Sequence, residues 1–170
     1  KLAPELKIRF VNVSELTALG FGDERHPLSI REEDFCCYFT NDKPVIFNFH
    51  GYPGTVKKLI YGHEIASRLT IHGYMEEGTT TTPFNMMVMN KTDRYHLAME
   101  ALVQGVKSQP KIAKKAKKLV AYFHKKLIAH TKYILKYGKD MPEIENWHWT
   151  RPFETMDAYE TACRCNYKHK

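Results

Sequence analysis

Two copies of the tripeptide His-Gly-Tyr are the residues of this chain whose types best suit chemistry: His50-Gly51-Tyr52 and His72-Gly73-Tyr74. A histidine at the end of a strand can act as a general acid or base, because its ordinary pKa is close to neutrality. No Ser, Cys or Asp is spaced around either histidine as in a catalytic triad, and no two histidines have the spacing of a helical metal motif. The sequence therefore favours a hydrogen-bonded structural histidine over a catalytic one at both positions.

A run of acidic and hydroxyl residues, Glu76 to Thr82, follows the second tripeptide and ends at Pro83. Free amides at the start of the next helix and four hydroxyls would suit a phosphate. The adjacent glutamates weigh against it, and threonines also cap helices and satisfy loop amides. We therefore expect a loop that docks on another domain. The candidate contact or ligand residues are His50, Tyr52, His72, Tyr74, Glu76, Glu77, Thr79, Thr80, Thr81 and Thr82.

The elements that must position these residues form a strand–helix–strand unit. Val45 to Phe49 is a short apolar run that predicts a buried strand, and Leu69 to Tyr74 predicts a second one. Val56 to Tyr61 fits a helix between them, closed by Gly62. A crossover through a helix implies parallel strands, so both His-Gly-Tyr segments should emerge at the same carboxyl edge of the sheet.

Before this unit, the alternation of Lys7–Val13 predicts another strand, and Ser29 with Glu32 predicts a capping box. After it, Thr82-Pro83 predicts the start of a short, buried apolar helix, and Thr92 is expected to cap the next helix. Lys111–Tyr137 should be the longest helix, closed by Gly138. The expected buried stripe on that helix is Ile112, Ala116, Leu119, Phe123, Leu127, His130 and Ile134.

Three strands among these helices predict an α/β fold, a three-layer αβα domain with a short, mostly parallel sheet flanked by helices. We expect this domain to span residues 1–150 and a C-terminal tail to span 151–170. Trp147-His148-Trp149 is expected to pack this end onto a neighbouring surface.

The net charge of +7 comes largely from lysines within Lys107–Lys139. A basic helix can bind nucleic acid or an acidic membrane. No aromatic residues for base stacking are interleaved on the lysine side, and lysines usually form the solvated side of an amphipathic helix. We therefore expect neither nucleic acid nor membrane as a partner. The cysteines, as Cys36-Cys37 and Cys163-Arg164-Cys165, are expected to be reduced thiols of a cytoplasmic protein, because no signal-peptide pattern is present.

Three longer strings add a resemblance to this interpretation. DKPVIFNFHGYP, IHGYMEEGTTTTPF and DMPEIENWHW closely resemble the C-terminal part of phosphoketolases, and the resemblance runs from about Leu6 to Trp149. Phosphoketolases are thiamine-diphosphate enzymes that split xylulose 5-phosphate or fructose 6-phosphate with phosphate, giving acetyl phosphate. The family differs from this chain at Pro53-Gly54, where a Pro-Trp is common, and in its shorter C-terminal end.

The resemblance implies that the parent enzyme uses thiamine diphosphate and Mg²⁺, held between the first two domains of two subunits. The third domain, similar to that of transketolase, would support architecture and dimer contacts. It also implies a further strand and helix upstream, which we expect to lie outside this chain. Because the chain has no Gly-Asp-Gly motif, we expect no cofactor, metal or catalytic residue in it.

The expected partners are therefore the N-terminal and middle domains of the parent enzyme and, in a homo-oligomer, a second subunit. Two alternatives remain open from the sequence. One is a stand-alone regulatory or metabolite-binding α/β module with a ligand at the strand edge near His50 and Thr79. The other, less favoured, is a basic nucleic-acid-binding protein.

Overall fold

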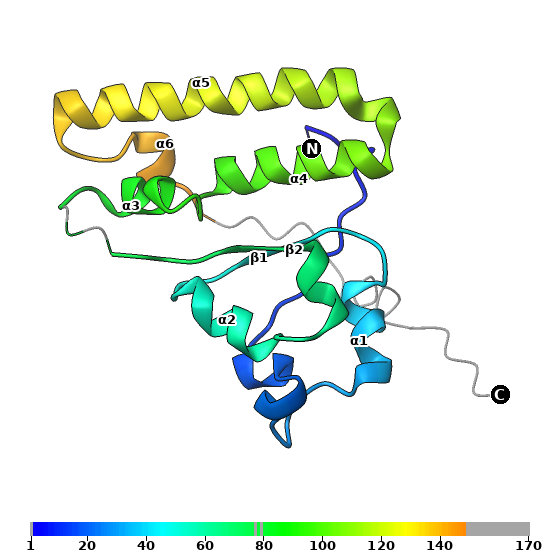
Figure 1. The fold of residues 1–170 in the computed structure, drawn as a ribbon. Coiled ribbons are helices and arrows are strands. Elements are labelled where there is room, and N and C mark those ends of the chain that lie inside the picture. Colours follow the sequence, from blue (N-terminus) through cyan, green and yellow to red (C-terminus); the bar gives the residue numbers. More distant parts are fainter. Residues whose placement is uncertain (1, 77, 79, 149–170) are drawn as a thin grey trace.

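A short parallel sheet lies at the centre of the molecule in the computed structural model, which describes residues 2–76, 78 and 80–148 (Figure 1). The strands β1 (Val45–Asn48) and β2 (Leu69–His72) pair in parallel, with Val45 opposite Leu69 and Asn48 opposite His72. The predicted α/β class and the parallel crossover are therefore confirmed. The sheet has two strands in the described part of the chain, not the predicted three.

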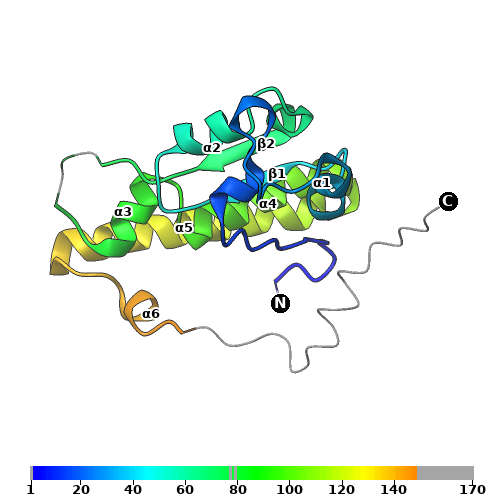
Figure 2. The ribbon, with the colours of Figure 1, turned by 90° about the horizontal axis from the view of Figure 1, so that it is seen from below.

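Helices cover both faces of this sheet and give the predicted three layers. On one side lies α4 (Arg94–Ser108), with α5 (Ala113–Tyr137) packed along its outer side (Figure 1). On the other side lie α1 (Glu32–Phe39) and α2 (Pro53–Leu59), which Figure 2 shows from below. The remaining helices are η1 (Leu16–Leu19), η2 (Gly22–Glu24), η3 (Glu64–Arg68), α3 (Pro83–Met89), η4 (Pro110–Ile112) and α6 (Pro142–Glu145).

The segment Lys7–Val13 is extended but forms no strand, so that prediction is wrong. Its backbone makes no backbone hydrogen bond to any other described residue. The predicted alternation is nevertheless real. Val11 and Val13 pack against the core, while Ile8 is 66% and Phe10 88% exposed. The side-chain pattern therefore separated the two sides of the segment, but a strand also needs a paired neighbour, which no described segment supplies.

One hydrophobic core, which we call the sheet core, lies between the sheet and the layer of α1 and α2. Its buried residues are Leu19, Phe35, Phe39, Val56, Ile60 and Ile65. The sheet contributes the pairs Val45–Leu69 and Phe47–Ile71, which alternate toward this side. The strand residues other than Asn48 are half-buried on both faces of the sheet, so the predicted strands are present but only partly buried.

A second core, the helical core, lies among the helices after the sheet. Phe84, Tyr95, Met99 and Leu127 are its buried residues, with Val88, Val120, Phe123 and Ile144 packed against them. The predicted stripe of α5 faces this side: Ile112, Ala116, Leu127 and His130 are buried, and Leu119, Phe123 and Ile134 are half-buried. The predicted burial of α3 is correct only for Phe84, because Met87 and Met89 are 39% and 38% exposed.

Helix ends agree with the predicted caps at two places and differ at two. Thr82 accepts a hydrogen bond from the amide of Asn85 at the start of α3, and Gly138 ends α5 in the left-handed conformation. Asp93, not Thr92, caps α4, because its carboxylate accepts from the amides of Tyr95 and His96. Ser29 is no cap; its hydroxyl donates to the carbonyl of Thr17, and α1 begins at Glu32, three residues beyond the predicted cap.

The start of α2 also lies earlier than predicted, at Pro53, because proline favours the first turn of a helix. At the other end of the described chain, Trp147 stays 55% exposed and lies under the guanidinium of Arg94, 5.4 Å from the ring centre. Trp149 is outside the described residues. None of the described helices is both long and apolar enough to cross a bilayer.

Candidate functional site at the carboxyl edge of the sheet

The two His-Gly-Tyr segments meet at the carboxyl edge of the sheet, but they are offset by two residues. In the register of the strands His72 pairs with Asn48, so His50 comes level with Tyr74. The rings of His50 and Tyr74 stack with centroids 4.5 Å apart. The two histidines are therefore not in matching positions, as the repeated tripeptide suggested, and each has its own surroundings.

Backbone contacts hold this edge rigidly. The amide of Phe49 donates to the carbonyl of His72 at 3.2 Å, and that of Tyr74 donates to the carbonyl of Gly51 at 2.9 Å. A Cβ at Gly73 would lie 2.3 Å from the carbonyl oxygen of Gly51 and 2.7 Å from the ring of Pro53. Only glycine fits so close an approach. The edge therefore continues the ladder beyond β2 and fixes the start of α2.

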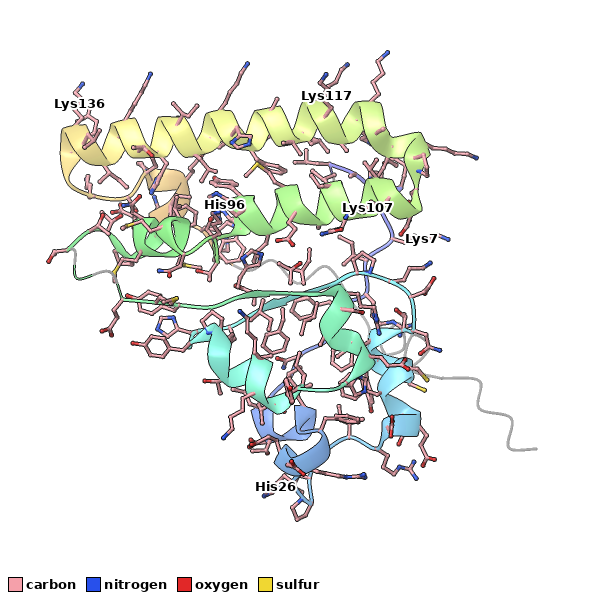
Figure 3. The ribbon with its side chains drawn as sticks, viewed as in Figure 1. Lys7, His26, His96, Lys107, Lys117 and Lys136 are labelled. Atoms are coloured by element: carbon pink, nitrogen blue, oxygen red, sulfur yellow. The ribbon has the colours of Figure 1, made fainter. Side chains whose placement is uncertain are left out.

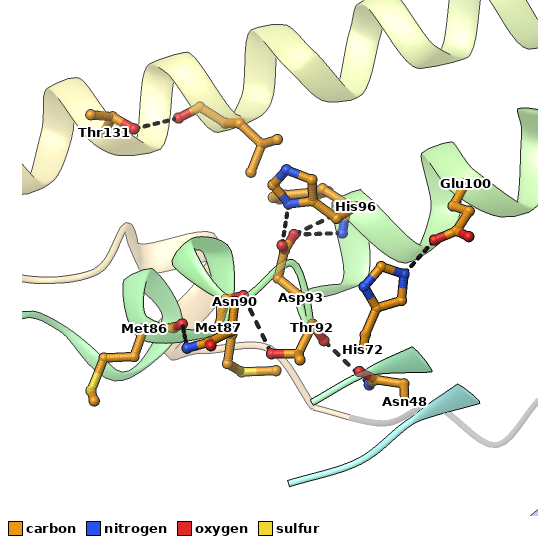
Figure 4. A network of polar contacts seen from close by, with 12 residues as sticks. Asn48, His72, Met86, Met87, Asn90, Thr92, Asp93, His96, Glu100 and Thr131 are labelled. Carbon is orange, nitrogen blue, oxygen red and sulfur yellow. Dashed lines mark hydrogen bonds and ion pairs between the residues drawn. The ribbon is translucent and has the colours of Figure 1, made fainter. Parts of the chain in front are cut away.

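His72 points toward α4 and pairs with Glu100 through its Nε2 (Figure 4). Both side chains are largely buried, with 15% and 19% of their surface exposed. Glu100 is a residue that the sequence analysis missed. One feature of the sequence could have predicted Glu100 as this partner. It lies one turn after His96 on α4, and this helix covers the face of the sheet on which His72 ends β2. The contact matches the expectation of a hydrogen-bonded histidine.

A second polar contact joins the same two layers. The side-chain amide of Asn48 donates to the carbonyl of Thr92 at 3.3 Å, and the hydroxyl of Thr92 donates to the carbonyl of Met87 (Figure 4). Beside them Asp93, fully buried, accepts from the amides of Tyr95 and His96 and pairs with the ring of His96. The sheet therefore meets the start of α4 through polar groups.

The loop after Tyr74 is held at both ends. The amide of Met75 donates to the side chain of Asn90 at 2.8 Å. At the far end the amide side chain of Asn85 donates to Thr81, and Thr82 donates to Asp140 at 2.5 Å. Glu76, Gly78 and Thr80 between these ties are exposed. Glu77 and Thr79 lie outside the described residues.

Asp140 takes the place that a bound anion would take at the start of α3. One carboxylate oxygen accepts from the hydroxyl of Thr82, and the other accepts from the amide of Phe84 at 3.2 Å. The threonine run does favour negative charge at this helix start, as its composition indicated, but a carboxylate from beyond the end of α5 satisfies it. These two donors are no longer free for a phosphate.

A shallow hollow of about 500 Å³ lies beside this tie. Its lining residues are Thr80, Thr81, Thr82, Pro83, Ile134, Gly138, Lys139, Asp140 and Glu145. Two carboxylates face one lysine there, which gives a phosphate little electrostatic attraction. Among the described residues no three His, Cys, Asp or Glu side chains are grouped to hold a metal ion. These residues do not fit thiamine diphosphate with Mg²⁺, and no step of such chemistry is assigned to them.

Exposed side chains at this edge have the composition of a contact surface. Tyr52 is 58% and Met75 53% exposed, and His50, Glu76 and Thr80 are exposed with them. The backbone below them is fixed by the ladder and by the ties of the loop. Rigid backbone with exposed aromatic and polar side chains can recognise a neighbouring surface without a large loss of conformational freedom.

Comparison with known proteins identifies the family. The family described as the XFP C-terminal domain matches residues 1–149. The chain belongs to this family. Its matched part includes both cores, the carboxyl edge and the loop that follows it. Because the match ends at residue 149, the tail 151–170 stays a prediction.

Relatives of this XFP C-terminal domain chain bear the name phosphoketolase. It is 46% identical over 149 residues to a probable phosphoketolase of Chlorobaculum tepidum and 44% identical over 149 residues to one of Bradyrhizobium diazoefficiens, each time covering 88% of this chain and 18% of the relative. A probable phosphoketolase of Clostridium acetobutylicum is 44% identical over 146 residues, 86% of this chain and 18% of the relative. The chain therefore spans about a fifth of the length of the curated relatives it matches.

Proposed function

We propose that this chain is the C-terminal structural and dimer-contact domain of a phosphoketolase. The complete enzyme cleaves xylulose 5-phosphate or fructose 6-phosphate with inorganic phosphate to acetyl phosphate and an aldose phosphate. The observation that carries the proposal is the family match over residues 1–149, together with relatives of that name at about 45% identity. The enzyme works in the cytoplasm as a homo-oligomer.

Thiamine diphosphate and Mg²⁺ belong, in this proposal, to the N-terminal and middle domains. When bound, thiamine diphosphate supplies the carbanion chemistry that splits the sugar phosphate. This chain supplies a rigid edge instead. The stacked rings of His50 and Tyr74 lie beside the exposed residues Met75, Glu76 and Thr80, which supports a contact with another domain or subunit.

The activity is tested with the complete protein that carries this chain. Supplied with thiamine diphosphate, Mg²⁺ and phosphate, it is expected to form acetyl phosphate from xylulose 5-phosphate or fructose 6-phosphate. Loss of product when phosphate is omitted distinguishes this reaction from transketolase-type transfer. No acetyl phosphate from either sugar phosphate would contradict the proposed activity.

A second experiment tests the proposal that the cofactor binds to the other domains and not to this chain. Calorimetric titration of the 170-residue chain with thiamine diphosphate and Mg²⁺ is expected to show no binding, because its described residues offer no cluster for the metal and no buried pocket for the cofactor. Micromolar binding to this chain alone would place part of the cofactor site here and contradict the division.

A further inference from the structure

The helix α5 carries an unbalanced positive charge. It contains eight lysines and no aspartate or glutamate. Lys115 pairs with Glu5 at 2.7 Å, and Lys126 pairs with Glu143 at 2.8 Å. The six other lysines are exposed, and within residues 2–76, 78 and 80–148 none of them forms a salt bridge. They are Lys114, Lys117, Lys118, Lys125, Lys132 and Lys136, which we call the outer lysine face.

These six lysines lie along one side of a straight rod. Their spacings of three, four and seven residues return to the same side of a helix with 3.6 residues per turn. Twenty-five residues make α5 about 37 Å long at 1.5 Å per residue. In Figure 3 Lys117 and Lys136, near opposite ends, both point away from the molecule. Because α5 is the outermost element of its layer, no described element lies beyond it on this side (Figure 1).

Aliphatic residues lie between the lysines on the same side. Ala121, Ile128 and Leu135 follow one another at intervals of seven, so they form a line on the outer lysine face. Ile128 is 56% and Leu135 83% exposed. The exposed tyrosines Tyr122 and Tyr137 lie off this line. The surface therefore combines positive charge with aliphatic side chains, and the exposed imidazole of His124 lies on the same side, seven residues after Lys117.

Contrary to the expectation from the sequence that a membrane is no partner, we propose that the outer lysine face binds an anionic lipid bilayer, with α5 lying flat on the headgroups. A straight helix at the outside of the molecule can bring the six lysines of this face to a flat surface at once. Lysines gain from a negative surface potential, and the aliphatic line can enter the boundary between headgroups and acyl chains. Against a nucleic acid, Ile128 and Leu135 would stay in water, whereas the boundary of a bilayer would take up both side chains.

The test measures partitioning of the 170-residue chain onto vesicles by co-sedimentation. Vesicles with phosphatidylserine in phosphatidylcholine are expected to bind the chain, and pure phosphatidylcholine vesicles are not. The triple variant Lys117→Gln, Lys125→Gln, Lys132→Gln should lower the partition coefficient about 100-fold, since one lysine near an anionic surface is worth about a fivefold factor.

A matched control removes the same charge elsewhere. Lys43→Gln, Lys57→Gln and Lys91→Gln alter three exposed lysines outside α5 and should change the partition coefficient by less than about threefold. Equal losses in the two triple variants would show that net charge alone attracts the chain, and this would overturn the proposal. So would equal binding to charged and uncharged vesicles.

The aliphatic line separates a bilayer from a nucleic acid. Ile128→Gln with Leu135→Gln should weaken vesicle binding about tenfold, because the lysines would then bind without insertion. If the chain instead bound a single-stranded RNA more tightly than the anionic vesicles at the same salt, and this double variant left both unchanged, the face would be a nucleic-acid site and the bilayer would be excluded.

Discussion

The sheet core and the helical core are built in the same way but from different halves of the chain. Every side chain of the sheet core comes from residues 11–71, and every side chain of the helical core comes from residues 84–144. Each half therefore buries most of its own apolar residues. Between the halves lie polar pairs such as His72–Glu100, together with Leu6, which packs beside Gly105 of α4. The contrast between the apolar cores and the polar contacts that join them suggests separate roles. Apolar burial stabilises each half, and hydrogen bonds fix the position of one half relative to the other.

The loop Met75–Thr82 is the covalent link between the two halves. It leaves the sheet core beyond β2 and reaches the helical core at α3, and its ties go to Asn90 and Asp140 on the helical side. A partner that contacted this loop would therefore contact the junction of the two halves. The candidate contact surface therefore lies where the two halves of the chain join.

Each half also holds a histidine against phenylalanine rings, with different consequences. His63 packs on Phe21 and Phe35, and its Nδ1 accepts from the amide of Ile65 at 3.0 Å. His130 packs on Phe84, and neither of its ring nitrogens has a well-formed hydrogen bond among the described residues. Burial lowers the pKa of both histidines.

The largest expected loss of stability comes from removing a buried side chain from the helical core. Phe84→Ala should destabilise the helical core by about 3–5 kcal/mol, the usual cost of removing a buried phenylalanine. Because the halves meet through polar contacts, amide exchange should accelerate more in α4 and α5 than in β1 and β2. Met87→Ala on the exposed side of α3 is the control, with a loss below about 1 kcal/mol. If amide exchange accelerated equally in both halves, the claim that each half is stabilised by its own core would be wrong.

Acid should weaken the helical core through His130. Its folded pKa lies below the ordinary 6.5, because burial outweighs the nearby Asp140, whose oxygen lies 3.2 Å from Nε2. As the pH falls, His130 therefore binds a proton more readily in the unfolded chain than in the folded chain. The free energy of unfolding is highest above about pH 6.5 and decreases as the pH drops below this value.

The measurement is the free energy of unfolding from about pH 8 to about pH 5, compared between the chain and its His130→Leu variant. The variant should lose part of the slope, and His124→Leu, an exposed position on the same helix, should keep it. His63 should still contribute a slope in the same direction, since its pKa is lowered as well. An unchanged slope in His130→Leu would show that this ring does not govern the acid response.

A smaller effect is expected at the polar layer. Glu100→Ala removes the partner of His72 and should cost about 1–2 kcal/mol, because the histidine nitrogen is left largely buried without its acceptor. Exchange of the amides of β2 should accelerate together with those of α4, since this contact joins the halves. If only one half responded, the pair would not couple them.

The sequence predicted the elements whose signals are local. The positions of β1 and β2, the start of α3 at Thr82-Pro83 and the end of α5 at Gly138 all follow from residues within a few positions. The parallel direction of the two strands follows from the helix between them. The strand at Lys7–Val13 was predicted wrongly because alternation reports burial and says nothing of a pairing partner.

The candidate site was predicted in position but not in its contacts. The two His-Gly-Tyr segments do lie at one edge. Their offset by two residues depends on the register, and the partners Glu100 and Asp140 come from 28 and 58 residues away. Such contacts follow from tertiary packing, and no local pattern of the sequence reports them.

The most direct test of the contact surface concerns the two glutamates of the loop. Glu76→Gln with Glu77→Gln in the complete enzyme should weaken association of its subunits or domains in sedimentation. In the 170-residue chain the same change should leave thermal melting nearly unaltered, because Glu76 is exposed and forms no salt bridge in the described part of the chain. If the chain melts much earlier while the enzyme still assembles, the glutamates are internal ties and the contact role is wrong.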